Sequence, residues 1–223
     1  MSWGDSFLNA RLARRVPAGG LRSYLETPPQ PGPTPLGETL LLAVDLETTG
    51  LDPATDRIVS VGMVDVDGAS IPLGSTATHV VAGTGPVGQS AVIHTLTDDA
   101  VAAGVPEEEA LDALFSRLAG RTLLAHHAAI ETGFLRAAVK RRYGVGIRIP
   151  AIDTIRLGQR LLGTHDDQQT SELRLWRLRS RLGLPTYRGH DAEIDALACA
   201  ELYLALVAHL RLGELRTALR MSS

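Results

Sequence analysis

The feature that most constrains the fold of this chain is a continuous apolar run that ends in acidic residues. Residues 39–45 read TLLLAVD, within the longer sequence TLLLAVDLETTG. An apolar run without polar alternation is typical of a strand that is buried on both faces. Asp45 and Glu47 close the run. The sequence therefore predicts a sheet covered on both sides, with carboxylates at the carboxyl end of a central strand.

The rest of the chain alternates strand and helix patterns. Asp67 and Gly68 predict a two-residue hairpin between the second and third strands. The predicted strands are 39–45, 57–65, 70–81, 121–125 and 147–152. The predicted helices are a short one from residue 97, then 106–118, 131–141, 154–162, 172–182 and 192–210. Three strands in a meander followed by strand–helix alternation predict an α/β fold, a mixed sheet flanked by helices.

The length and the proline distribution suggest one main domain behind an N-terminal extension. A chain of 223 residues can bury a sizeable core. Residues 1–25 are basic and mildly amphipathic, and the proline-rich residues 27–35 suit a semi-rigid linker. We therefore expect an N-terminal helix or arm with its linker over 1–37, one domain over 38–212 and a tail over 213–223. The N-terminal segment is either a helix packed on the outside of the domain or an arm that docks a protein partner.

Other features point to a cytoplasmic protein without membrane contact. No run reaches the ~18 uninterrupted apolar residues of a membrane span, since the best stretch, 196–210, carries Glu201 and His209. Asp5 lies where a signal peptide needs its apolar core. The single cysteine, Cys199, excludes internal disulfides and cysteine-rich zinc sites and fits a reducing compartment.

Acidic residues recur at three points along the sequence. Asp45 and Glu47 are two apart on a strand, so they share a face, with α-carbons roughly 6.5–7 Å apart. Such hard oxygen ligands suit Mg²⁺ or Mn²⁺, although a turn cap and a solvated carboxylate would explain an arbitrary pair. Glu131 starts a helix, where a carboxylate also complements the helix dipole. His190 precedes the last helix, which carries Asp195, and a histidine beside a bound cation can act as a general base near neutral pH.

Together, VDLETTGLD, AHHAAIETGFL and HDAEIDALA, in this order and spacing, resemble the three motifs of the DEDDh 3′–5′ exonucleases. This family belongs to the ribonuclease H-like superfamily and includes the proofreading epsilon subunit of bacterial DNA polymerase III. The resemblance spans residues 40–210, and it implies the ribonuclease H-like mixed sheet, a three-strand meander plus parallel strands. The first and third motifs are the most specific, and the N-terminal 35 residues lie outside the resemblance.

The resemblance implies a two-metal hydrolysis that releases nucleoside 5′-monophosphates from a 3′ end. Asp45, Glu47 and Asp195 take the positions of metal ligands for two Mg²⁺ or Mn²⁺ ions, and Glu131 takes the position of the family's fourth acid. His190 takes the position of the general base, which removes a proton from the attacking water.

The same resemblance implies where the terminal nucleotide binds. Thr48, Thr49 and Leu51 would line its pocket, with Leu51 wedged against the base in a way that favours single strands. A tight turn with a core leucine is the structural explanation for the same residues. His127, in the second motif, takes a substrate- or loop-positioning place.

The second motif departs from the family pattern twice. The family usually has Asn-Ala-x-Phe-Asp, whereas this chain has His127 in place of the asparagine and Glu131 in place of the aspartate. Glu131 is one methylene longer and can still reach an ion directly or through water. One alternative is therefore a catalytically weakened nucleic-acid-binding or regulatory module. Another is an unrelated Mg²⁺ phosphohydrolase with Asp45 as nucleophile, but that chemistry wants a second aspartate where Glu47 stands and a supporting lysine.

The expected substrate is the 3′ end of single-stranded DNA or short RNA, and the sequence leaves the choice open. With 25 acidic residues, 22 basic ones and 4% aromatics, the composition excludes a protein that coats nucleic acid by charge and stacking. It permits an enzyme that grips one or two terminal nucleotides. The basic run 140–142 and the arginines of 174–181 suit a solvated helix face. A homodimer and a protein partner held by the N-terminal arm remain open.

Overall fold

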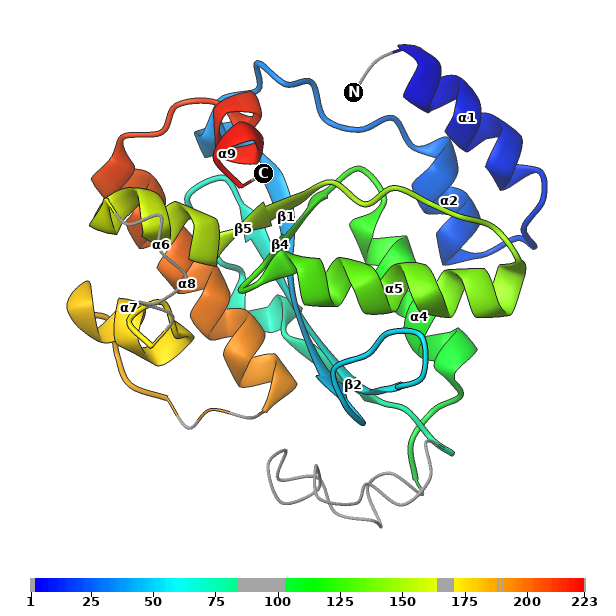
Figure 1. Cartoon of the computed structure of the whole chain (residues 1–223). Coiled ribbons are helices and arrows are strands. Elements are labelled where there is room, and N and C mark those ends of the chain that lie inside the picture. The colour runs from blue at the N-terminus through cyan, green and yellow to red at the C-terminus, as the bar shows by residue number, and fades with distance from the viewer. Residues whose placement is uncertain (1–2, 84–102, 164–170, 188, 190, 223) are drawn as a thin grey trace.

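The computed structural model describes residues 3–83, 103–163, 171–187, 189 and 191–222, and has a five-stranded sheet with helices on both faces (Figure 1). The strands are β1 (Leu40–Thr48), β2 (Ile58–Asp67), β3 (Ala77–Val80), β4 (Thr122–Ala125) and β5 (Ala151–Asp153). The helices are α1 (Trp3–Ala13), α2 (Gly20–Glu26), α4 (Glu107–Leu118), α5 (Ala128–Tyr143), α6 (Thr154–Leu162), α7 (Leu175–Arg181), α8 (Ala192–Leu210) and α9 (Leu215–Met221), with short 3₁₀ helices η1 (Leu36–Glu38) and η2 (Leu73–Ser75). No helix in these ranges is both long and apolar enough to cross a bilayer.

The sheet has the order β3-β2-β1-β4-β5. β1 pairs antiparallel with β2, and β2 pairs antiparallel with β3. β1 pairs parallel with β4, and β4 pairs parallel with β5. The predicted mixed α/β sheet is therefore confirmed, and the carboxyl ends of β1, β4 and β5 lie at the same end of the sheet.

Side chains of β1 alternate between two hydrophobic cores because successive residues of a strand face opposite ways. Leu42, Val44 and Leu46 enter a core that contains buried residues of α1, α2, α4 and α5. Leu41 and Ala43 enter a second core with α6, α7, α8 and α9. This double burial is the reason for the uninterrupted apolar run in the sequence.

Most predicted elements are confirmed, and two strands are shorter than predicted. The hairpin after β2 forms, since Asp67 and Ser70 exchange two backbone hydrogen bonds. The chain then reaches Pro72, which has no N–H to donate, and makes η2 before β3 begins at residue 77. In the predicted strand 147–152, Ile147 and Ile149 are buried in the first core, and β5 begins only after Pro150. The short helix predicted from residue 97 lies outside the described residues.

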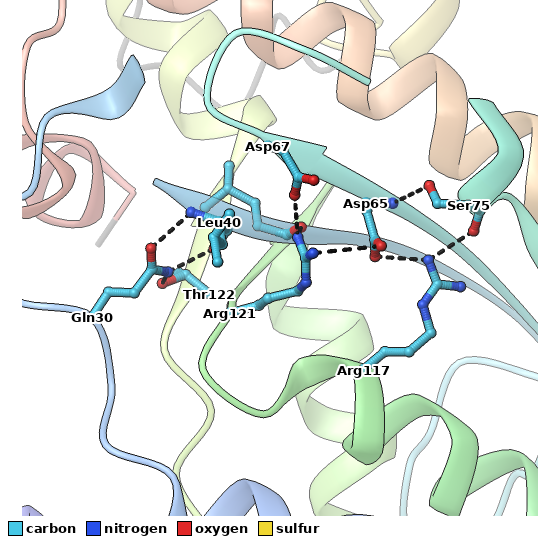
Figure 2. Close-up of polar contacts among 9 residues, drawn as sticks. Gln30, Leu40, Asp65, Asp67, Ser75, Arg117, Arg121 and Thr122 are labelled. Carbon is cyan, nitrogen blue, oxygen red and sulfur yellow. Dashed lines mark hydrogen bonds and ion pairs between the residues drawn. The ribbon is translucent and has the colours of Figure 1, made fainter. Parts of the chain in front are cut away.

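Both ends of the chain pack against the sheet and its helices. Val16, Leu21 and Leu25 belong to the first core, and the predicted tail forms α9 in the second. The side chain of Gln30, in the proline-rich stretch, pairs with Leu40 like a neighbouring strand (Figure 2). Its Oε1 accepts the Leu40 N–H at 2.7 Å, and its Nε2 donates to the Leu40 carbonyl at 2.6 Å. The proline-rich stretch is thus attached to the beginning of β1.

Two arginines form ion pairs at the end of the sheet where β1 begins (Figure 2). Arg121 donates to Asp67 at 2.6 Å, and Arg117 donates to Asp65 at 2.7 Å and to the carbonyl of Ser75 at 2.7 Å. These contacts tie α4 and the start of β4 to the end of β2. They lie at the end of the sheet opposite Asp45 and Glu47, which are at the carboxyl end of β1.

Candidate active site

Asp45 and Glu47 lie on the face of β1 that α8 covers. Asp45 and Glu47 have the same parity along β1 as Leu41 and Ala43, whose side chains enter the second core. Glu47 is buried and Asp45 is partly buried. A strand period of two therefore places both carboxylates on one face, as the sequence predicted, and this face is the one covered by α8.

The third acid reaches them because the start of α8 lies directly on β2. Gly62 is the β2 partner of Asp45. A Cβ on Gly62 would overlap the carbonyl of Ala192 and lie 2.5 Å from the backbone nitrogen of Glu193, in the first turn of α8. Through this close approach, ligand atoms of Asp45, Glu47 and Asp195 all come within 4.8 Å of one another.

Burial and mutual repulsion shift the titration of these acids. Burial, and then the charges of Asp195, Glu47 and Asp191, raise the pKa of Asp45 well above its ordinary value. Burial, followed by the charges of Asp195 and Asp191, raises the pKa of Glu47 to about 7. Repelling carboxylates in a partly buried site are stabilised by a cation, and an all-oxygen donor set fits Mg²⁺ or Mn²⁺. The residues present therefore fit the divalent ions that the sequence implied.

Glu131 lies close to this group but outside it. Its side chain comes from the first turn of α5 and is 4% exposed. Its Oε2 has no hydrogen-bond partner among the described residues. Burial, and then the charge of Asp45, raise the pKa of Glu131 well above its ordinary value. The three-acid group whose oxygens lie within 4.8 Å does not include it.

The turn that carries Glu131 is held by Asp153, the last residue of β5. Its carboxylate accepts the backbone N–H groups of His127 and Ala128, each at 3.1 Å. It also caps α6 by accepting the N–H of Ile155 at 2.8 Å. His127 has a left-handed backbone, with φ of 82°, a conformation in which asparagine and histidine are enriched. Its exposed side chain lines the cavity beside the acids.

The two threonines of the Thr-Thr-Gly turn after β1 have different roles. Thr48 is buried, lines the cavity and donates to the carbonyl of Gly50 at 2.6 Å. Thr49 donates instead to Asp56 at 3.1 Å, so its hydroxyl stabilises the turn. Leu51 lines the cavity with 82% of its surface exposed. Thr48 and Leu51 thus face the cavity, whereas Thr49 stabilises the loop after β1.

His190 lies outside the described residues, but its neighbours lie beside the acids. Gly189 lines the cavity, and a Cβ on it would lie 3.7 Å from Oδ1 of Asp195. Asp191 caps α8, accepting the N–H groups of Glu193 at 3.1 Å and Ile194 at 3.3 Å.

The acids line one side of a cavity of about 1400 Å³, and α7 lines another part of it. Among the lining residues to which the sequence assigned no role are His126 and Trp176, and Arg179, one of the arginines expected on a solvated helix face, is buried. Nδ1 of His126 lies 2.8 Å from the hydroxyl of Thr154, and burial lowers the pKa of His126 to about 4. No local pattern marks these residues: His126 follows the apolar residues 123–125, and Trp176 and Arg179 lie among alternating leucines and arginines.

Comparisons with known proteins agree with this geometry. The family model described as exonuclease, of the RNase T type, matches residues 42–203. The DNA polymerase III epsilon subunit of Treponema pallidum is 30% identical over 171 residues, covering 75% of this chain and 76% of that protein. The PolC-type DNA polymerase III of Thermotoga maritima is 29% identical over 207 residues, covering 89% of this chain. The match spans only 14% of that polymerase.

Solved structures give the same result for the fold. Exonuclease X, in complex with 5′-overhanging duplex DNA, superposes with a TM-score of 0.62 at 22% identity. The superposition covers 82% of this chain and 99% of the other. At this identity the likeness establishes the fold, and it confirms the predicted ribonuclease H-like sheet.

Proposed function

Because the chain belongs to the exonuclease family matched over residues 42–203, we propose that it is a metal-dependent 3′–5′ exonuclease. Membership confirms the resemblance to the DEDDh exonucleases that the three motifs predicted. The proposed reaction hydrolyses the last phosphodiester bond at the 3′ end of a single strand and releases a nucleoside 5′-monophosphate.

The observation that carries the proposal is the convergence of three carboxylates in a cavity wall. Asp45 and Glu47 come from β1 and Asp195 from α8, with ligand atoms within 4.8 Å of one another. Burying these acids and bringing them together is costly for folding, since burial, and then the charges of Asp195 and Asp191, raise the pKa of Glu47 to about 7. The cost is understandable if the group serves to hold cations.

In the proposed mechanism the four acids bind the metal ions and His190 is the general base. Asp45, Glu47 and Asp195 would hold two Mg²⁺ or Mn²⁺ ions, and Glu131 would support them directly or through water. When bound, the ions stabilise the charge on the attacking and leaving oxygens. His190 accepts a proton from the attacking water, since a histidine can exchange protons near neutral pH.

The terminal nucleotide is proposed to bind beside the acids, against Thr48, Leu51 and His127. Leu51 is 82% exposed, so it can insert beside a base that is not paired. Thr49 supports this pocket through its bond to Asp56. The names of the epsilon subunit and of the Exonuclease X complex favour DNA as the substrate. Short RNA is the alternative substrate.

Glu131 is the reason to keep a second candidate function. It stands where the family has aspartate, and it lies outside the three-acid group. If its reach does not suit the ions, the chain would bind nucleic acid without efficient cleavage and act as a regulatory module.

The test uses 5′-labelled DNA and RNA oligonucleotides of one sequence with Mg²⁺ or Mn²⁺. The native chain is expected to shorten them from the 3′ end and release 5′-monophosphates, and Asp45→Ala and His190→Ala to abolish this. Glu26→Gln is the matched control, because it removes an exposed acid outside the cavity lining. Metal-independent cleavage would refute the proposed mechanism, and binding without cleavage would favour the regulatory module. Glu131→Asp is expected to raise the rate or change the metal preference.

Protein partners are part of the same proposal. The names of the related epsilon subunit and PolC-type polymerase favour a replicative polymerase as a partner. The N-terminal residues 1–37 are its proposed contact. A homodimer is the alternative. Light scattering of the chain alone, followed by titration with a polymerase subunit, separates the two.

A further inference from the structure

Exposed apolar side chains gather in the cavity that holds the acids. Among the described residues, six large hydrophobic side chains are exposed, and three of them line this cavity: Leu51, Trp176 and Tyr187. Trp176, on α7, is the largest and is 54% exposed. A large apolar side chain left in water at a cavity wall commonly marks a binding surface.

The neighbours of Trp176 are cationic. The guanidinium carbon of Arg177 lies 4.3 Å from the centroid of the Trp176 ring, so it covers one face of the indole. Arg174 precedes α7, is exposed and lines the same cavity. An aromatic ring beside guanidinium groups is what proteins offer to single-stranded nucleic acid, the ring for a base and the cations for the phosphates.

We propose that Trp176 is a stacking platform for a nucleobase of the substrate strand, upstream of the 3′-terminal nucleotide. Arg177 holds the indole in place, and Arg174 attracts the adjoining phosphate. The choice of ligand rests on the proposed exonuclease function, because the platform and the acids share one cavity. An apolar protein segment is the weaker occupant, since exposed Arg177 covers one face of Trp176 and exposed Arg174 lines the same cavity.

A stacking platform at Trp176 should affect cleavage of a long substrate and not of a minimal one. A strand that extends beyond the terminal nucleotide can reach Trp176, whereas the p-nitrophenyl ester of thymidine 5′-monophosphate occupies only the site beside the acids. Trp176→Ala is expected to lower kcat/KM for a single-stranded oligonucleotide about tenfold or more, the usual effect of losing one stacked base. The same variant should leave kcat/KM for the ester within about twofold.

Two variants control for structural effects. Trp176→Phe keeps a stacking ring and should restore most of the activity on the oligonucleotide. Leu73→Ala removes an exposed apolar side chain that does not line the cavity, and it should leave kcat/KM for both substrates unchanged. Equal losses on both substrates in Trp176→Ala would overturn the platform, because they would indicate a general effect on the fold.

Binding can be measured without cleavage. The chain has two tryptophans, so Trp3→Phe leaves Trp176 as the only one. In this variant, with Ca²⁺ replacing the catalytic ions, a DNA oligonucleotide should quench the indole fluorescence, and the monophosphate ester should not. Absence of quenching together with unchanged kinetics of Trp176→Ala would refute the platform while leaving the exonuclease function intact. Failure of the native chain to cleave any substrate would instead refute the exonuclease function, and quenching would still report the platform.

Discussion

Gly62 of β2 and Ala192 of α8 approach so closely that no side chain fits between them. A Cβ at Gly62 would overlap the Ala192 carbonyl, and Gly62 is the residue paired with Asp45 in the sheet. The glycine therefore sets how near the first turn of α8 comes to the acids of β1. Asp195 lies one turn further along α8, so its position depends on the same contact.

Gly62→Ala is expected to disturb both the fold and the acidic group. The added methyl must displace backbone atoms of Ala192 and Glu193 rather than a flexible side chain. We expect a loss of about 2 kcal/mol or more in the free energy of unfolding, as for other overpacked cores, and weaker Mn²⁺ binding. Urea denaturation and metal titration by calorimetry measure the two effects. Gly74→Ala is the control, since nothing lies within 4 Å of a Cβ there; equal stability of the two variants would contradict the prediction.

Asp153→Ala should destabilise the chain and slow cleavage together. It removes a helix cap and leaves the N–H groups of His127 and Ala128 without their acceptor. The expected cost is about 3 kcal/mol, from one cap and two unpaired donors. Asp153→Asn should cost less, because its amide keeps one acceptor oxygen. Asp191→Ala removes an exposed cap alone and should cost about 1 kcal/mol, so a similar cost at Asp153 would be evidence against its role in the β4–α5 turn.

Arg179→Met tests the ion pair between Arg179 and Glu201, which the sequence of α7 does not reveal because arginine recurs along it. Arg179 is 3% exposed and donates to Glu201 at 2.7 Å and to the carbonyls of Ala198 at 2.6 Å and Pro185 at 2.9 Å. Removing it takes away all three bonds and the cationic partner of Glu201, which keeps its bond from the Tyr187 hydroxyl, for an expected loss of about 3 kcal/mol. Arg181→Ala, on the exposed face of the same helix, should stay within about 0.5 kcal/mol. Chemical denaturation of both variants makes the comparison, and similar small losses would refute the role of Arg179.

Metal removal should make stability depend on pH through Glu47. Its folded pKa of about 7 exceeds the ordinary value of 4.5, so between these pH values the folded state holds more protons than the unfolded state. In EDTA this group therefore contributes stability below pH 4.5 that is lost as the pH rises through 7, by roughly 1–3 kcal/mol. Mn²⁺ binds the deprotonated acids, so the increase in Tm on adding it should be larger at pH 8 than at pH 5.

Glu47→Gln provides the comparison for that measurement. The variant should reduce the pH dependence in EDTA without abolishing it, since this titrating carboxyl is gone while Asp45 and Glu131, whose pKa values are also raised, remain. His126, with its pKa lowered to about 4, gives the folded chain an opposite slope below pH 6.5, so the difference between native chain and variant is the quantity to follow. An equal effect of Mn²⁺ on Tm at both pH values would contradict the assignment of Glu47 to the ion site.

Elements with strong local signals could be predicted from the sequence. The apolar run of β1 marked a strand buried on both faces, and α8 spans Ala192–Leu210 as predicted. Asp45 and Glu47 share a face because a strand has a period of two, which requires no knowledge of the rest of the fold. Three motifs in order then identified the family.

The sequence by itself determined the order of the five strands along the chain and which acids could meet, whereas the tertiary structure decided which of them do. Asp195 joins Asp45 and Glu47 within 4.8 Å, while Glu131 stays outside that group. Distances between elements depend on how closely backbones pack, as Gly62 allows for α8, and no local propensity records that. For the same reason Arg179 is buried and Trp176 exposed on one short helix, because packing against α8 and the cavity, not residue type, sets which face meets water.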